Sequence, residues 1–493
     1  MVDALRLSMI SAGFLLLAGC KDDATEDGET ETDGIMLTAG EEGADGSGTG
    51  QKLDVGGADT GNVGCGEGVG QCGDRIDLLF IIDNSGSMGE EQLNLASNMP
   101  KLVRGLESLT DEMGMPVTPD VHIMVTTTDS GNVLCDPFYP PGRTPENGAP
   151  ISSSCTDRLD RFESLTQPPV NAEEACTSVC PMPLAPDGDY IDFSGAGANV
   201  PDVDPVDVDG DGEADSAVAQ TLSCMGPQGI DGCGYESPLD SMLNALDPAA
   251  PWNQGSQPFL RDGALLAVAL ISDEADCSVV DETVMMDTDV QQTHPDTGMP
   301  VPTSAICWNA GVSCDGPDGD GVYTNCESSG DRLRPVQEYI DYLQGQDRRV
   351  VMLGIVGVPP VTERNPDPPF QPIAGGVLDL VYRDWRDPDY DNGGDILPDD
   401  WNEGRDAAYK EYQFGIGPGC TGEDGAGGFT GQAIPPVRIK EVCQALDIAD
   451  DPDTPNEDES EIRCCMESIC DTDFSPALRC LTGLIQENVI PTE

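Results

Sequence analysis

The chain has 493 residues, which is enough for two or three average domains or for one domain with large insertions. Its 91 acidic and 23 basic residues give a formal net charge of −68 at pH 7. Such a charge disfavours binding to nucleic acids and to anionic membrane surfaces, because both are polyanions. It favours divalent cations, which neutralise clustered carboxylates, although most of the acidic residues are expected only to keep the surface soluble.

The N-terminus predicts an exported lipoprotein. Arg6 precedes the apolar run MISAGFLLLAG, which is too short to span a bilayer and is typical of a signal peptide. LAGC (residues 17–20) resembles the lipobox of bacterial lipoproteins, which implies cleavage before Cys20 and acylation of that cysteine. Lys21, in place of the aspartate that retains lipoproteins at the inner membrane, points to the outer membrane of a Gram-negative bacterium. The alternative is an ordinary secretory signal with a coincidental cysteine.

The cysteine count agrees with export. The chain has 19 cysteines, and removing Cys20 for the lipid leaves an even number, which an exported chain is expected to pair as disulfides. With only two histidines and no CxxC motif, zinc ribbons, zinc fingers and thioredoxin-like sites are disfavoured. The short-range candidate pairs are Cys65–Cys72, Cys224–Cys233 and Cys314–Cys326.

Residues 21–64 differ in composition from the rest of the chain. They begin KDDATEDGETETDG and are rich in Asp, Glu, Gly and Thr, so they cannot bury enough apolar surface to offset the entropy of ordering. We interpret them as a disordered acidic tether between the membrane anchor and a folded part that begins near residue 65.

Strands and helices alternate along the folded part. Continuous apolar runs predict strands at 75–83, 120–129, 264–273 and 348–358. Helical spacing predicts helices at 90–109, where Pro100 would kink or split the helix, at 237–246, with Ser237 as N-cap and Pro238 at the first position, and at 334–346. A short strand and a helix from Ser475 close the chain. This alternation predicts an α/β fold: a doubly wound, mostly parallel sheet with helices on both faces.

Three long intervals do not fit a minimal fold of this kind. They lie at about 130–235, 275–330 and 359–435 and are rich in Pro, Gly, Asp and Cys, with little periodicity. We interpret them as disulfide-pinned insertions in a single domain that spans residues 65–490.

The polar residues that follow two of the strands suggest a ligand site. Asp83 and Asp273 end the first and third predicted strands, and the carboxyl ends of such strands meet at one edge of the sheet. Ser85 and Ser87 add two hydroxyl groups, so the set offers only oxygen atoms, which hard divalent cations prefer. The alternative for Asp83 and Ser85 is capping of the helix that follows.

These residues also carry a family resemblance. DNSGSM (83–88) resembles the DxSxS motif of von Willebrand factor type A (VWA) domains, the metal-ion-dependent adhesion site, and ISDEADC (271–277) resembles the strand that supplies its distal aspartate. The resemblance is closest to large, cysteine-rich VWA lipoproteins of delta-proteobacteria and myxobacteria, and it covers most of residues 75–490. It implies a Rossmann-like fold in which Ser85 and Ser87 bind Mg²⁺ or Ca²⁺ directly, while Asp83 and Asp273 act mainly through bound water.

The sequence departs from the family pattern at one ligand. The loop before the second major helix normally gives a threonine, whereas the matching segment, DGCGYESPLDSML, has none. Glu236 or Ser237 must replace it, and we favour Glu236. A direct Glu236 ligand would weaken the attraction of the metal for a carboxylate of a partner protein, and it would favour Ca²⁺, which tolerates more carboxylates, over Mg²⁺.

A second calcium loop is predicted in the first long insertion. The segment DVDGDGEAD (207–215) resembles the calcium loops of EF-hand and dockerin-like repeats, with Gly212 at the sharp turn. Val218 stands where an EF-hand has its bidentate glutamate, so we expect an isolated loop; the alternative is a solvated acidic turn. The expected ligands are Asp207, Asp209, Asp211 and Asp215.

Together these features predict an outer-membrane-anchored lipoprotein that binds a divalent cation and engages a protein partner, one that presents a carboxylate, through the metal-site face. The first alternative is a structural envelope protein, stiffened by metal and disulfides, whose metal site is closed. A metal-assisted hydrolase is less favoured, because the sequence has neither an HExxH nor a GxSxG motif and no histidine near the predicted site.

Overall fold

The computed structural model describes residues 75–110, 114–164, 169–390, 393–423, 428–449 and 460–488. The signal peptide, Cys20, the acidic tether and the Cys65–Cys72 pair therefore lie outside the described residues. Across the described ranges, no helix combines the length and the apolar character that crossing a bilayer requires.

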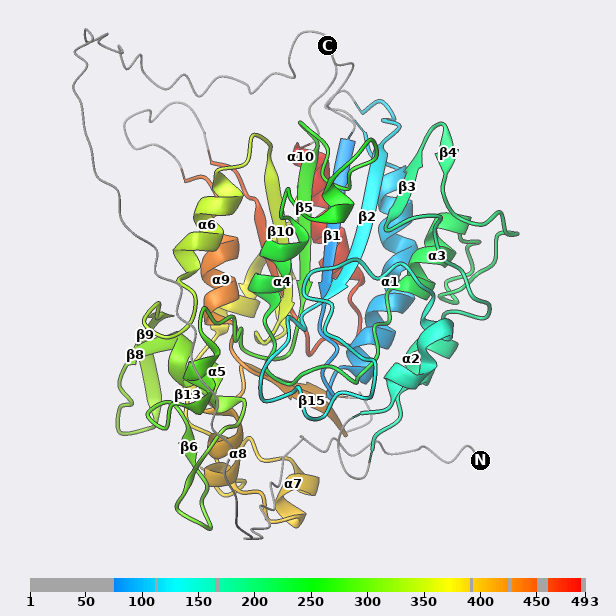
Figure 1. The fold of residues 1–493 in the computed structure, drawn as a ribbon. Coiled ribbons are helices and arrows are strands. Elements are labelled where there is room, and N and C mark those ends of the chain that lie inside the picture. Colours follow the sequence, from blue (N-terminus) through cyan, green and yellow to red (C-terminus); the bar gives the residue numbers. More distant parts are fainter. Residues whose placement is uncertain are drawn as a thin grey trace, which may run out of the picture. The chain divides into compact units, whose positions relative to one another are not determined.

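A seven-stranded sheet forms the centre of the fold, in the order β16–β10–β5–β1–β2–β3–β4 (Figure 1). Its strands are β1 (Arg75–Ile82), β2 (Asp120–Thr127), β3 (Ile191–Ser194), β4 (Gly197–Ala198), β5 (Leu265–Ile271), β10 (Val350–Val356) and β16 (Cys464–Ser468). The five strands from β16 to β2 are parallel, and β3 and β4 add an antiparallel edge. The predicted α/β class with a mostly parallel sheet is confirmed.

Helices cover both faces of this sheet. One face carries α1 (Gly89–Glu107), α3 (Ala217–Met225) and α10 (Ser475–Asn488), and the other carries α4 (Pro238–Ala245), α6 (Val336–Gln344) and α9 (Val437–Gln444). Each predicted helix is present; α3 and α9 were not predicted. Pro100 lies inside α1, which continues through it as one helix.

The two-sided burial explains why the central strands are apolar at every position. In β1, Ile76, Leu78 and Phe80 pack into the core on the α1 side, while Leu79 and Ile81 pack into the core on the α4 side. All five side chains are fully buried. Successive side chains of a strand point to opposite faces, so a strand covered on both sides needs a continuous apolar run rather than an alternating one.

The start of α4 shows how the loops near the sheet edge are held. Ser237 is the N-cap and Pro238 opens the helix, as predicted, but the Ser237 side chain makes no capping hydrogen bond. Instead, the amide of Leu239 donates to Asp276 Oδ1 at 3.2 Å, and the amide of Asp240 donates to Ser278 Oγ at 3.0 Å. The loop after β5 thus caps α4 and fixes the segment that precedes it.

The long insertions contain most of the remaining elements. These are α2 (Glu174–Thr177), β6 (Gln292–Thr293), β7 (Pro300–Val301), α5 (Ala305–Gly311), β8 (Val312–Asp315), β9 (Val322–Ser328), β11 (Val361–Arg364), β12 (Pro372–Gly375), β13 (Tyr382–Arg383), α7 (Pro398–Asn402), α8 (Ala407–Phe414), β14 (Cys420–Glu423) and β15 (Phe429–Ala433). Strand β13 pairs with β9, so the second and third insertions share one small sheet and one apolar cluster around Trp308 and Trp385.

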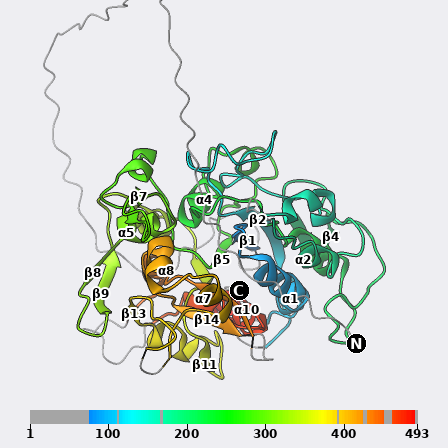
Figure 2. The same ribbon diagram turned by 90° about the horizontal axis from the view of Figure 1, so that it is seen from below.

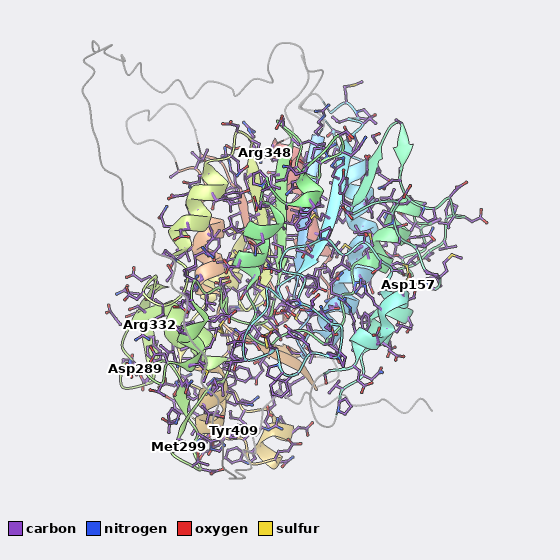
Figure 3. All side chains as sticks on the ribbon, in the orientation of Figure 1. Asp157, Asp289, Met299, Arg332, Arg348 and Tyr409 are labelled. Carbon is purple, nitrogen blue, oxygen red and sulfur yellow. A yellow bond between two sulfur atoms is a disulfide. The ribbon has the colours of Figure 1, made fainter. Side chains whose placement is uncertain are left out.

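The first insertion is less separate from the core than predicted. Its strand β3 extends the central sheet, and its helix α3 packs against α1. The reason is local: Ile191 and Phe193 alternate with polar residues in β3 and are buried beside β2. The second and third insertions instead build a lobe of their own, in which Figure 3 labels Met299 and Tyr409.

The described residues contain eight disulfides, and six of them involve an insertion. The eight disulfides join Cys135–Cys233, Cys155–Cys176, Cys180–Cys224, Cys277–Cys307, Cys314–Cys326, Cys420–Cys470, Cys443–Cys464 and Cys465–Cys480. The predicted Cys314–Cys326 pair is confirmed, whereas the predicted Cys224–Cys233 pair is wrong. Although these two cysteines are close in sequence, Cys224 ends α3 in the small apolar cluster with Cys180, and Cys233 belongs to the cluster with Trp308.

Disulfide mapping tests this correction. Digestion of the unreduced, denatured protein with Asp-N protease cuts before Asp231 and so separates Cys224 from Cys233. Mass spectrometry should then find Cys224 linked to a peptide that contains Cys180, and Cys233 linked to one that contains Cys135. A Cys224–Cys233 linkage would contradict the arrangement of the first insertion described here.

Candidate metal centre

The sheet brings two predicted site residues to one edge. Ile82 of β1 pairs with Ile271 of β5, and Asp83 and Asp273 follow these strand ends. The amide of Asp83 donates to the carbonyl of Ile271 at 2.9 Å, and the carbonyl of Asp273 accepts from the amide of Ile434. Strand β1 lies between β2 and β5, so the chain leaves β1 toward one side of the sheet first and later returns to the other side. The carboxyl ends of β1 and β5 therefore form a topological switch point, the usual ligand position in open α/β folds.

The loop after β1 folds around the Asp83 carboxylate. Its Oδ1 accepts the amide of Ser85 at 2.8 Å, and its Oδ2 accepts the hydroxyl of Ser272 at 2.5 Å. The Ser85 and Ser87 hydroxyl oxygens lie 3.1 Å apart. Gln92, in the first turns of α1, donates to the Asp83 carbonyl at 2.7 Å and ties the loop to the helix.

Glu236 reaches the same place from the loop before α4. It is fully buried and interacts directly with the Asp83 carboxyl group. The hydroxyl of Thr128, just after β2, donates to Glu236 Oε2, and the amide of Ser237 donates to the Thr128 carbonyl at 3.0 Å. Sequence reasoning missed Thr128; the polar run TTTD at the end of an otherwise apolar strand was the available signal.

We call the set Asp83, Ser85, Ser87, Glu236 and Asp273 the strand-end centre. Asp83 and Glu236 are completely buried, Asp273 is 8% exposed, Ser85 is buried and Ser87 is partly exposed. No ion pair reaches any of its three acids from the described part of the chain. Buried carboxylates without a cationic partner are costly, because burial removes the hydration of the charge.

The pKa values of these acids reflect that cost. Burial, followed by repulsion from Asp83, raises the pKa of Asp273 from 3.8 to about 7, while a hydrogen bond from Ser87 opposes the rise. Burial and the same neighbour raise the pKa of Glu236 well above its ordinary value. The pKa of Asp83 is also raised, chiefly by burial. A divalent cation at this place would lower all three values by favouring the charged forms.

Two buried oxygen atoms of the strand-end centre have no hydrogen-bond partner, Glu236 Oε1 and Asp273 Oδ1. Buried polar atoms usually have a partner, and a cation at this place would provide one for both oxygen atoms. The available donors are carboxylate and hydroxyl oxygens, which suit Mg²⁺ or Ca²⁺ and no soft metal. The residues present therefore fit the predicted cation.

Two further acids stand close to this centre. The pKa of Glu274 is raised well above its ordinary value, first by burial and then by Asp273, and the pKa of Glu91 is raised by burial and by Asp273. Glu91 was not predicted. Asp276 is 2% exposed and pairs with Arg438 at 2.8 Å, and it caps α4 from inside the fold.

The predicted calcium loop at 207–215 is closed by a side chain of α1. Arg104 contacts three of the four predicted ligands: Asp209 at 3.3 Å, Asp211, and the buried Asp215 at 2.7 Å. Asp207 accepts the amides of Gly210 and Gly212 within the loop. Asp207, Asp209 and Asp211 lie close enough together to hold an ion, but calcium would have to compete with the Arg104 guanidinium.

A third group lies at the opposite end of the central strands, near the start of β2. Asp120, His122 and Asp192 each place one potential ligand atom within 4.8 Å of the others, so this group could hold a metal ion. Arg261 donates to Asp120 at 2.7 Å and would compete with it. His122 is buried within β2, and burial and Arg261 lower its pKa. Asp83, Glu236 and Asp273 form no such three-acid group among the described residues, so the strand-end centre depends on its serine hydroxyls.

Comparisons with known proteins do not add to this geometry. The chain matches no protein-family model, no curated protein and no solved structure. The resemblance to VWA domains therefore stays a prediction, carried by the residues of the strand-end centre and by the order of the elements around it.

The raised pKa of Asp273 predicts a pH dependence for the metal-free protein. The folded state holds the Asp273 proton more tightly than the unfolded state does, so the free energy of unfolding in EDTA should fall as the pH rises from about 4 through about 7. Asp273→Asn should flatten this decline and make the protein more stable at neutral pH, by at most about 4 kcal/mol, since one pKa unit corresponds to about 1.36 kcal/mol.

Urea unfolding at several pH values measures this effect. Asp202→Asn, at an exposed position, is the matched control and should leave the curve unchanged. Equal curves for wild type and Asp273→Asn would show that the charged Asp273 carboxylate does not destabilise the folded state.

The calcium-loop geometry gives a second prediction. Arg104→Gln should lower the free energy of unfolding in EDTA by about 1–3 kcal/mol, because buried Asp215 loses a charged hydrogen-bond partner. Added Ca²⁺ should then stabilise the variant more than the wild type. Glu213→Gln, at a residue whose side chain is 71% exposed and 3.7 Å from Arg104, should change little. An Arg104→Gln protein as stable as the wild type would refute this role of Arg104.

Proposed function

We propose that this chain is an outer-membrane lipoprotein whose VWA-type domain binds a divalent cation, Mg²⁺ or Ca²⁺, at the strand-end centre. We further propose that it engages a protein partner through the same face, with a carboxylate of the partner entering the coordination shell of the metal. The membrane part of this proposal rests on the LAGC segment and Cys20, and the metal part rests on the described fold.

One observation carries the metal proposal. Buried Asp83 raises the pKa of buried Glu236 and Asp273, and these acids come from three separate loops. No cationic side chain of the described residues pairs with them, and Glu236 Oε1 and Asp273 Oδ1 are left unpartnered. Elsewhere the same fold neutralises its buried acids with arginine, as Arg438 does for Asp276. A bound cation would neutralise the strand-end centre and satisfy its free oxygen atoms.

The partner proposal follows from how the centre faces solvent. Gly86 is exposed and Ser87 is partly exposed, whereas the acids behind them are buried. A metal held there would be reached from the Gly86–Ser87 side of the loop. A carboxylate is the side chain that an Mg²⁺ or Ca²⁺ ion binds most readily from a partner surface.

Glu236 supports a structural alternative. It is fully buried, and a direct bond from it would place up to three carboxylates around one divalent cation. Such a centre would be negatively charged overall and would repel a further carboxylate. In that case the metal would only stiffen the domain together with the disulfides.

We propose a binding role rather than catalysis. His122 lies five residues before the end of β2, roughly 16 Å along the strand from the strand-end centre at 3.3 Å per residue. His294 packs against Tyr409 and Tyr412 in the insertion lobe. The hydrolase alternative would therefore need a general base made of carboxylates alone.

Metal binding is tested with the cation itself. At a concentration 100 times the dissociation constant, Ca²⁺ or Mg²⁺ should stabilise the wild type by about 2.7 kcal/mol, and Ser85→Ala should remove most of this gain. Ser97→Ala is the control, since that serine lies on α1 and bonds only to the Leu93 carbonyl. Equal metal-dependent stabilisation of the wild type, Ser85→Ala and Ser97→Ala would contradict the metal proposal.

Mn²⁺ in place of Mg²⁺ then separates the binding role from the structural one. Water-proton relaxation counts the exchangeable water molecules on bound Mn²⁺, and an open centre should give a strong enhancement that added acetate reduces. A closed centre should bind Mn²⁺ with little enhancement and no effect of acetate. The second result would favour the structural role and overturn partner binding through the metal.

A further inference from the structure

A cavity of about 500 Å³ lies away from the strand-end centre, between α1, α10 and the hairpin β11–β12. Lys101 and Gly105 of α1 line one side, and Ser475, Arg479 and Thr482 of α10 line another. The loop between β11 and β12 supplies the third side. Figure 2 shows α1, α10 and β11 together in the view from below. The volume of this cavity is within the usual range for sites that bind small molecules.

Close helix packing holds the walls of this cavity in place. A Cβ atom at Gly105 would come within 2.8 Å of Thr482 Cγ2, so only glycine lets α1 and α10 approach this far. A Cβ atom at Gly483 would come within 2.7 Å of the Pro369 carbonyl oxygen, so the hairpin loop also rests directly on α10. The cavity is thus a feature of tightly packed elements rather than of a loose loop.

The charge of the cavity is opposite to that of the protein. Its lining contains Lys101, Arg364 and Arg479 and no carboxylate, in a chain with a formal net charge of −68. Arg364 is neutralised by Glu467, at 2.5 Å, and lies 3.8 Å from Asp471.

Lys101 and Arg479 are different. No carboxylate of the described residues lies within 4.0 Å of either cationic group, whereas most described arginines, such as Arg261 and Arg438, pair with an acid. Asp473, near the start of α10, is engaged by the amide and hydroxyl of Ser475. Lys101 is partly buried and Arg479 is exposed at the cavity, and a pair of cations without an acidic partner among the described residues suits an anionic ligand.

The two cations are also held in position. The Arg479 guanidinium carbon lies 3.8 Å from the centre of the Phe370 ring, and the Lys101 ammonium donates to Asn98 Oδ1 at 2.7 Å. Stacking on the ring restrains the guanidinium plane and leaves its N–H groups for a planar or tetrahedral oxyanion. Phe370 and Pro476 add apolar surface to the same cavity.

We propose that this cavity binds a small organic anion: a carboxylate or phosphate group carried on a compact apolar body. Lys101 and Arg479 bind the oxyanion. The apolar body packs on Phe370 and Pro476. This site is independent of the metal proposed at the strand-end centre, since none of its residues belongs to that centre.

Calorimetric titration tests the proposal with phenyl phosphate, benzoate and inorganic phosphate as probes. EDTA removes divalent cations, and an ionic strength of about 0.15 M screens the distant acidic surface, since the Debye length is then about 8 Å. The variants are Lys101→Gln and Arg479→Gln. Arg386→Gln is the matched control, because Arg386 also lies over an aromatic ring, that of Tyr390 at 4.5 Å, but outside the cavity.

We expect at least one of the two aromatic anions to bind the wild type with a dissociation constant below about 1 mM and to bind each cavity variant about tenfold or more weakly, which corresponds to 1.4 kcal/mol. The Arg386→Gln protein should match the wild type. If inorganic phosphate bound as tightly as phenyl phosphate, the role of the apolar wall would be overturned. Absence of binding by all three probes, or equal weakening by Arg386→Gln, would overturn the site.

Discussion

The burial of several carboxyl groups without a cationic side chain, at the carboxyl edge of the sheet, is the constraint on which the rest of this structure depends. Asp83 and Asp273 reach that edge because β1 and β5 are parallel neighbours, and Glu236 reaches it because the loops after β2 and β5 hold the segment before α4. Each contact brings like charges together and raises their pKa values. This cost can be relieved by protonation of the acids or by the divalent cation that we propose at this centre.

Other acidic places in the molecule have their own cation, which makes the contrast informative. At the opposite edge of the sheet, near the labelled Arg348 in Figure 3, buried Asp77 accepts two hydrogen bonds from Arg261 and lies 3.6 Å from Arg348. Burial still raises the pKa of Asp77 to about 6, but both arginines oppose it. In the acidic loop of the first insertion, Arg104 plays the same part. At the strand-end centre no cationic side chain of the described residues does so, which is the contrast behind the divalent cation that we propose there.

The insertions extend this simple sheet at its edges. The first adds an antiparallel strand pair to the sheet and a helix to α1, while the second and third join in a separate apolar cluster through β9 and β13. The third also places the β11–β12 hairpin against α10, which forms the cationic cavity. Cys420–Cys470 connects the third insertion to the segment after β16, and Cys135–Cys233 joins the two ends of the first insertion. Both candidate sites thus lie where loops meet a rigid α/β scaffold.

The sequence by itself determined the strands, their order of alternation with helices, and the acids and serines at the strand ends, because these follow from periodicity over short distances. Tertiary structure alone decided what depends on distant segments meeting. Thr128 joins Glu236 across 108 residues, Arg104 enters the acidic loop from α1, and Cys224 pairs with Cys180 rather than with its neighbour in sequence. No local pattern encodes these contacts, since each is fixed by how the insertions fold back on the sheet.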